Sequence, residues 1–133
     1  HLSKNYNNVA VLIGYELGLS KRMKQASDVW LNNPRVPREA SGTSGMTAAM
    51  NGAVNFSTDD GWIPEFINHG NNGFVVPKAD YDNMSTQQQD DYDLDEMYKI
   101  LEDLPDGWYK IDINTTILVD NYYKPFYSLK ISG

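Results

Sequence analysis

The chain has 133 residues, which is enough for one domain, and 41% of them are hydrophobic and 22% charged. Its formal net charge of −7 argues against nucleic acid and anionic membranes as partners, because both require a basic surface. It has no cysteine, which excludes disulfides and thiolate metal sites and is compatible with a cytoplasmic protein. No apolar run is long enough to span a membrane, no signal-peptide pattern is present, and the first residue is not methionine, so we expect a piece of a longer protein.

The first half of the chain alternates predicted strands and helices. Short strands rich in apolar residues are predicted at 8–15, 28–33, 53–58 and 73–77. The first of them, Asn8–Tyr15, is apolar throughout, which predicts burial on both faces as in a parallel sheet. Helices are predicted at 16–28 and at 46–53, the second ending at Asn51-Gly52. This alternation predicts an α/β fold with Rossmann-like parallel winding over residues 1–80.

The second half, residues 81–133, is expected to form a separate region. Its first part lies in the acidic segment Lys78–Asp93, which predicts a solvated loop or linker. An amphipathic helix is predicted from Asp93 onward, with Asp93 and Glu96 as a capping pair. The apolar residues on one face of that helix are Leu94, Met97, Tyr98 and Leu101.

From Gly107 to the end, the pattern leaves two interpretations open. The alternation of Tyr109, Ile111 and Ile113 is typical of a strand. The stretch 120–129 is instead compatible with a closing helix interrupted by Pro125, and its aromatic residues would anchor it against the sheet.

The glycine-rich stretch 38–62 carries the strongest chemical signal. A glycine-rich turn that enters a helix leaves backbone N–H groups unpaired and adds the partial positive charge of the helix dipole, so it favours an anion. Ser41, Thr43 and Ser44 add hydroxyls that can bind phosphate or sugar oxygens, and the Glu39 carboxylate can accept from a sugar hydroxyl. The alternative is a loop that only turns the chain, since the spacing is neither a dinucleotide fingerprint nor a Walker loop.

Several other residues have a structural interpretation beside a functional one. Asp59 and Asp60 are more typical of turn chemistry than of an acid–base pair. His69 lacks a partner at ligand spacing, so we expect no metal site. Trp30 is expected in the core, and Trp62 near the candidate site.

Two arginines flank the loop. Arg35 and Arg38 can meet a substrate phosphate, or they can be solvated or paired with carboxylates.

The residues from Asp28 to Trp62, including EASGTSGM at 39–46, resemble the sugar- and cofactor-binding segment of the α-glucan (glycogen and maltodextrin) phosphorylases. His69–Pro77 also resembles a loop and strand of related retaining glycosyltransferases. The resemblance implies a Rossmann-like part of the C-terminal lobe of a two-lobed (GT-B type) enzyme. It implies transfer of glucosyl units between an α-1,4-glucan and phosphate or glucose 1-phosphate, in glycogen or starch metabolism.

The resemblance also implies roles for individual residues. Glu39 would bind a hydroxyl of the transferred glucose, and the backbone of Ala40, Ser41 and Gly42 would hold its other hydroxyls. In the same way, Thr43 and Ser44 would grip the phosphate of the cofactor, pyridoxal phosphate.

Thr47 departs from the family pattern. It stands where the phosphorylases have the lysine that forms a Schiff base with the cofactor, and threonine has no amine with which to do so. Related sugar-nucleotide enzymes have a glutamate there, which threonine does not replace either.

Three functions therefore remain open at the sequence level. The first is a phosphorylase-like glycosyltransferase that needs an N-terminal lobe, so that the 133 residues alone are inactive. The second is a glycogen synthase-like enzyme that uses a sugar nucleotide, and the third is a non-catalytic glucan-binding module. A homodimer is compatible with each of them.

Overall fold

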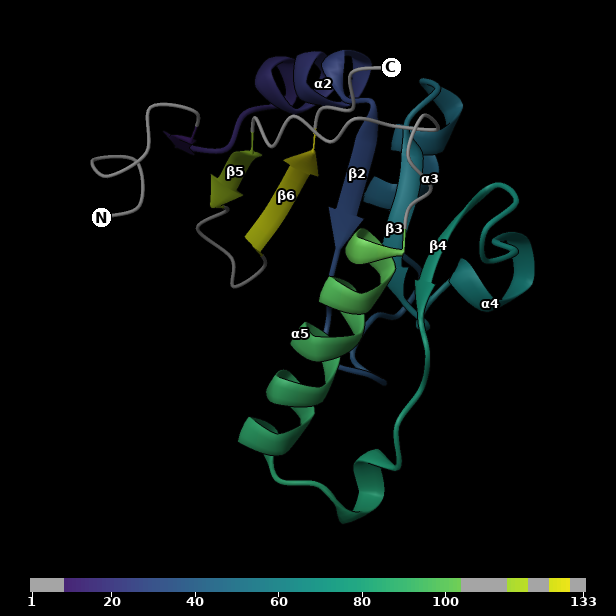
Figure 1. The fold of residues 1–133 in the computed structure, drawn as a ribbon. Coiled ribbons are helices and arrows are strands. Elements are labelled where there is room, and N and C mark those ends of the chain that lie inside the picture. Colours follow the sequence, from purple (N-terminus) through teal and green to yellow (C-terminus); the bar gives the residue numbers. More distant parts are fainter. Residues whose placement is uncertain (1–8, 104–114, 120–124, 130–133) are drawn as a thin grey trace.

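The computed structural model describes residues 9–103, 115–119 and 125–129 of the chain, which form a small α/β domain. Within these residues, six strands make one sheet in the order β1-β5-β6-β2-β3-β4 (Figure 1). The strands are β1 (Ala10–Ile13), β2 (Val29–Asn32), β3 (Val54–Thr58), β4 (Gly73–Val76), β5 (Thr115–Val119) and β6 (Pro125–Leu129). The helices are α2 (Leu17–Ala26), α3 (Thr43–Met50), α4 (Ile63–Phe66) and α5 (Thr86–Glu102), with a 3-10 turn η1 at Tyr81–Asn83.

The strands β2, β3 and β4 are three adjacent parallel strands, and β1 and β5 form a second parallel pair. Trp30 of β2 lies beside Asn55 of β3, and Phe56 of β3 lies beside Phe74 of β4. These three strands, together with α2 and α3, confirm the elements predicted for residues 16–77. The predicted division of the chain near residue 80 stays a prediction.

The position of β1 corrects one expectation. The strand predicted at Asn8–Tyr15 forms, but it lies at the edge of the sheet and pairs only with β5. Ile13 is 83% exposed, and the two buried clusters found among the described residues contain no residue of β1. The apolar run therefore predicted the strand correctly, but the predicted burial on both faces is wrong. Burial depends on which elements pack against a strand and not on its composition alone.

The C-terminal strands correct a second expectation. β6 runs antiparallel between β5 and β2, so the whole sheet is mixed and not purely parallel. Pro125 is the first residue of β6, a position where the missing N–H of proline is tolerated. The closing helix considered for 120–129 is thus wrong at 125–129. The strand considered for Tyr109–Ile113 lies outside the described residues.

Helices cover both faces of the parallel strands, with α5 in front of the sheet and α3 behind it in Figure 1. The cluster on the α5 side contains Val29, Phe56, Val76 and Met97, with Ile100 and Leu101 packed against it. The cluster on the α3 side contains Trp30, Ala48 and Ala53, with Met23 of α2 packed against it. Adjacent residues of one strand point to opposite layers, which explains why Val29 and Trp30 are both 2% exposed.

The start of α5 differs from the prediction. The helix begins at Thr86 inside the segment expected to be a loop, and Ser85 is its N-cap. The Ser85 hydroxyl accepts from the Gln88 amide at 3.2 Å, while the Gln88 side chain accepts from the Ser85 amide at 2.8 Å. This reciprocal capping box satisfies two amides that a helix start would otherwise leave unpaired. Asp93, the predicted cap, lies in the helix interior.

The predicted apolar face of α5 is only partly buried. Met97 and Leu101 pack on the core, whereas Leu94 is 50% and Tyr98 56% exposed. None of the helices in the described ranges is both long and apolar enough to cross a bilayer.

Asp93 has a structural partner in η1. The Tyr81 hydroxyl donates to Asp93 Oδ1 at 3.0 Å, which ties the segment before α5 to the helix. Burial, the largest cause, raises the pKa of the Asp93 carboxyl above its ordinary value, against the opposing effect of the Tyr81 hydrogen bond. Burial likewise raises the pKa of Tyr81 to about 12.

The capping box predicts that Ser85→Ala will lower the free energy of unfolding by about 1 kcal/mol, because the Gln88 amide loses its acceptor. Urea unfolding followed by circular dichroism measures this change. Thr86→Ala is the matched control, one residue away and inside the helix, and an equal loss in both variants would contradict the assignment of Ser85 as the cap.

The raised pKa of Asp93 predicts a pH-dependent effect of Asp93→Asn. Because the pKa is higher in the folded than in the unfolded state, Asp93 favours folding at low pH, and this contribution is lost as pH rises through the folded-state pKa. Asparagine keeps an acceptor for Tyr81 without the charge. The difference in melting temperature, variant minus wild type, should therefore be larger at pH 7 than at pH 3.5. Thermal unfolding of both proteins at both pH values measures it. A difference that does not change between the two pH values would contradict this account.

Candidate functional site

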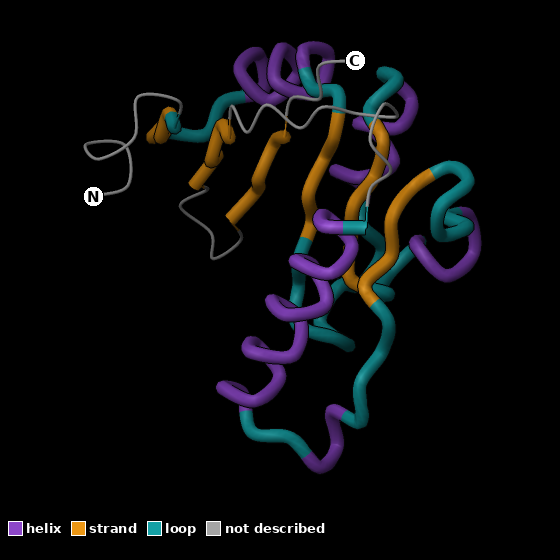
Figure 2. Tube along the Cα trace, viewed as in Figure 1, coloured by secondary structure: helices purple, strands orange, loops and turns teal. Residues whose placement is uncertain are grey.

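The candidate site lies where the parallel strands end. The segments that follow β2, β3 and β4 gather at one end of the sheet, as Figure 2 shows. This is the end at which open α/β sheets bind ligands. The segment after β2, residues 33–42, leads into α3 and contains the residues singled out from the sequence.

The start of α3 is formed by a glycine with left-handed backbone geometry. Gly42 is the N-cap, with φ 87° and ψ 41°, and no side chain caps the helix. The amides of Thr43, Ser44 and Gly45 have no acceptor among the described residues, whereas the next amide, that of Met46, bonds to the Gly42 carbonyl. Three N–H groups and the positive end of the helix dipole are therefore available to an anion at this position.

The indole of Trp62 packs directly against this helix start. An ideal Cβ on Gly42 would lie 2.7 Å from Trp62 Cδ1, and one on Gly45 would lie 2.9 Å from Trp62 Nε1. Both distances are too short for a real methyl group, so this approach requires glycine at both positions. The Trp62 amide also donates to the Ser41 carbonyl at 3.0 Å. Trp62 thus lies beside the site, as expected, and packs against the start of α3.

Asn55 of β3 contacts the same first turn. Its side-chain amide donates to the Gly45 carbonyl at 3.1 Å, and an ideal Cβ on Gly45 would lie 2.8 Å from its Oδ1. Asn55 Oδ1 and Trp62 Nε1 are both buried, and neither has a hydrogen-bond partner in the described ranges. The contact between Asn55 of β3 and Gly45 of α3 joins two different elements, so no short-range sequence signal predicts it. Sequence reasoning therefore missed Asn55.

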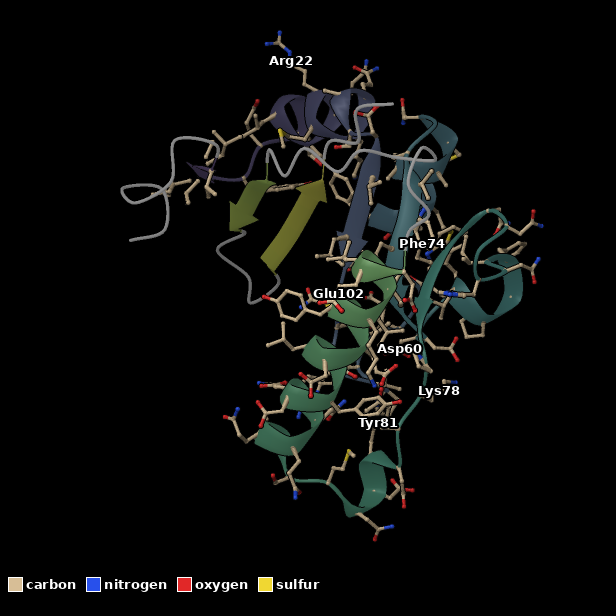
Figure 3. All side chains as sticks on the ribbon, viewed as in Figure 1. Arg22, Asp60, Phe74, Lys78, Tyr81 and Glu102 are labelled. Atoms are coloured by element: carbon tan, nitrogen blue, oxygen red, sulfur yellow. The ribbon has the colours of Figure 1, made fainter. Side chains whose placement is uncertain are left out.

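Asp60 organises the loop from the other side. Its Oδ2 accepts from the Glu39 amide at 2.8 Å and its Oδ1 from the Gly61 amide at 2.9 Å. The Asp60 carboxylate therefore stabilises a turn by accepting backbone hydrogen bonds, as the Asp-Gly sequence predicts. The neighbouring Asp59 instead pairs with Lys78 at 3.5 Å. Figure 3 labels Asp60, Lys78 and Tyr81 at this end of the molecule.

The structure brings the predicted sugar-binding residues to this loop. Glu39 is half-buried, with its Cγ 2.9 Å from the ideal Cβ position of Gly61. Ala40 and Ser41 are exposed, and Gly42 is buried under Trp62. The exposed Thr43 and half-buried Ser44 follow in the first turn of α3. Their roles in binding stay predictions.

Thr47 lies one turn further along α3. Its hydroxyl donates to the Thr43 carbonyl at 2.8 Å, and its own carbonyl accepts from the Asn51 side chain at 2.8 Å. The side chain is thus engaged by the backbone of its own helix. It offers no nucleophilic nitrogen to a carbonyl compound.

The other candidate residues divide into structural and available ones. Arg35 is ion-paired with Asp90, which corresponds to the structural alternative considered for it. Arg38 is exposed, and no carboxylate among the described residues pairs with it. Trp30 is in the core, as expected. His69 accepts from the Val75 amide through Nδ1 at 3.0 Å, a contact within the loop and strand that follow α4.

Comparison with known proteins finds similar segments in several longer proteins. No family model matches the chain, and no solved structure matches it. An uncharacterized protein of Methanocaldococcus jannaschii is 40% identical over 105 residues, which are 78% of this chain and 19% of that protein. The maltodextrin phosphorylase of Thermococcus litoralis is 43% identical over 96 residues, or 72% of this chain and 11% of the phosphorylase. A glycogen phosphorylase of Mycobacterium tuberculosis is 39% identical over 95 residues, or 71% of this chain and 11% of that protein.

These similarities support a phosphorylase-family fragment and confirm the resemblance drawn from the sequence. The chain is related to proteins named maltodextrin and glycogen phosphorylase over about 71% of its length. It spans only 11% to 19% of the length of these curated relatives.

The packing at the helix start predicts that Gly45→Ala will destabilise the chain by about 1–3 kcal/mol, because the new methyl group overlaps Trp62 and Asn55. In an open helix, the same change would stabilise by up to about 1 kcal/mol. A double-mutant cycle with Trp62→Ala isolates the overlap, since the cost should shrink when the indole is absent. Equal effects of Gly45→Ala in both backgrounds, measured by urea unfolding, would contradict the close contact.

Proposed function

We propose that this chain is part of the C-terminal lobe of a two-lobed retaining glycosyltransferase of the α-glucan phosphorylase kind. The whole protein would transfer a glucosyl unit between the end of an α-1,4-glucan and phosphate, with glucose 1-phosphate as the phosphorylated sugar. The observation that carries the proposal is the start of α3, where three amides with no acceptor among the described residues adjoin the loop of Glu39. The names of the related proteins support phosphate rather than a sugar nucleotide as the second reactant.

The roles of the residues follow from their positions. The amides of Thr43, Ser44 and Gly45 would hold a phosphate group, with the hydroxyls of Thr43 and Ser44 as further donors. The Glu39 carboxylate would accept from a glucose hydroxyl, since Asp60 holds the Glu39 amide and thereby fixes its backbone. The exposed backbone of Ala40 and Ser41, together with Gly42, would bind other hydroxyls of the sugar.

Pyridoxal phosphate, the cofactor implied by the family resemblance, fits this chain only in part. The helix start has the donors for a phosphate group. Thr47 cannot form the covalent link, because it has a hydroxyl bonded to the Thr43 carbonyl in place of an amine. The residues present therefore do not fit a covalently attached pyridoxal.

The proposal predicts activity only for the full-length protein, because the described residues form one side of a site and its N-terminal lobe would form the other. The full-length protein, incubated with maltoheptaose and inorganic phosphate, should release glucose 1-phosphate, while the 133-residue chain should release none. Glu39→Gln should lower kcat/KM by about 10- to 100-fold, the value of a charged hydrogen bond to the sugar.

Glu65→Gln is the matched control, since Glu65 is exposed on α4 and should leave kcat/KM unchanged. Glucosyl transfer from a nucleoside diphosphate glucose, with no phosphorolysis, would overturn the proposal in favour of a synthase-like enzyme. Binding of maltooligosaccharide without turnover of any donor would favour a glucan-binding module.

A further inference from the structure

The loop that carries Glu39 is attached to α5, a helix more than fifty residues away in sequence. Arg35 donates to both oxygens of Asp90, from Nε to Oδ1 at 2.7 Å and from Nη2 to Oδ2 at 2.7 Å. One residue along each segment, the Gln89 side chain donates to the Val36 carbonyl at 3.2 Å. We call these three hydrogen bonds the α5 clamp. They join two consecutive residues of the loop to two consecutive residues of the helix.

Thr58 of β3 and Asp60 in the turn after β3 also hold this loop. The Thr58 hydroxyl at the end of β3 donates to the Pro34 carbonyl at 2.9 Å, and Thr58 is fully buried. Further along, Asp60 accepts from the Glu39 amide. The loop is therefore attached to the end of β3 through Thr58 and to the turn after β3 through Asp60, with the α5 clamp between these two points.

The clamp is better suited to fixing an orientation than to stabilising the fold. Both partners of the ion pair are about two-fifths exposed, at 42% for Arg35 and 40% for Asp90, and such surface pairs contribute little to stability. Their two-pronged geometry, however, fixes the direction of the guanidinium as well as its distance. The buried Gln89 side chain adds a bond to the backbone itself, which restricts the carbonyl three residues before Glu39.

Arg35 is engaged in this ion pair, whereas Arg38, also exposed, has no ion-pair partner among the described residues. The Arg38 amide donates to the Arg35 carbonyl at 2.9 Å. A turn thus links the clamped residue to the residue next to Glu39. Loosening the clamp would loosen this turn.

We propose that Gln89 and Asp90 are positioning residues, which act through Arg35 and Val36 to hold the Glu39 loop in the arrangement that binds the sugar. The part of the inference that concerns the sugar rests on the proposed function. The mechanical part, that α5 controls the mobility of the loop, does not.

Hydrogen exchange on the 133-residue chain tests the mechanical part. In Asp90→Ala, the amides of Arg38 and Glu39 should exchange about three- to tenfold faster than in the wild type, because the loop opens locally more often. Asp91→Ala is the matched control, since Asp91 is exposed and, as far as the structure describes the chain, its side chain bonds only to Gln87 of its own helix. The paired exchange Arg35→Asp with Asp90→Arg should restore slow exchange. Equal rates in Asp90→Ala and Asp91→Ala would overturn the proposal.

Kinetics of the full-length protein test the positioning role. Asp90→Ala and Gln89→Ala should raise KM for the glucan or lower kcat by about threefold or more, with a change in melting temperature no larger than that of Asp91→Ala. Unchanged kinetics despite faster loop exchange would refute the positioning role. If the wild-type protein itself shows no phosphorolysis, the proposed function fails, while the exchange result still decides whether the clamp controls the loop.

Discussion

The contact between the Trp62 indole and the glycines at the start of α3 is the constraint on which the candidate site depends. The ring lies so close to Gly42 and Gly45 that neither can carry a side chain. Gly42 also adopts a left-handed backbone conformation in which other residues are strained. Together these features exclude side chains at Gly42 and Gly45, so that the helix start beside the loop of Glu39 presents backbone at these two positions.

The consequence is a site built from backbone more than from side chains. In a helix start of this kind the binding group is the N–H itself, and its direction is fixed by the helix. Thr47, which the family resemblance implies to stand in place of a cofactor lysine, bonds through its hydroxyl to the Thr43 carbonyl within its own helix and leaves these amides unaltered.

The strands β2, β3 and β4 and the helices α2 and α3 could be predicted because their signals are local: apolar runs with β-branched residues, a helical stripe, and the Asn51-Gly52 pair that ends α3. The capping box of α5 is also visible in the sequence as Ser85-x-x-Gln88. The polar, acidic composition of that segment nevertheless predicts a loop, and the Asp93–Glu96 pair offers a similar capping pattern further on. Two features had no local signal. The insertion of β6 between β5 and β2 is a tertiary pairing, and the Arg35–Asp90 pair spans 55 residues. The loop of Glu39 was predicted in place, but its anchors were not.

The most direct test of the account is a titration of the isotope-labelled chain with inorganic phosphate, followed by amide chemical shifts. We predict saturable shifts centred on the amides of Thr43, Ser44 and Gly45, since these have no acceptor within the described part of the chain. The same titration with sulfate would show whether the site recognises phosphate or any tetrahedral anion. Shifts that never saturate, or that spread over the exposed lysines and leave those three amides unmoved, would contradict the account.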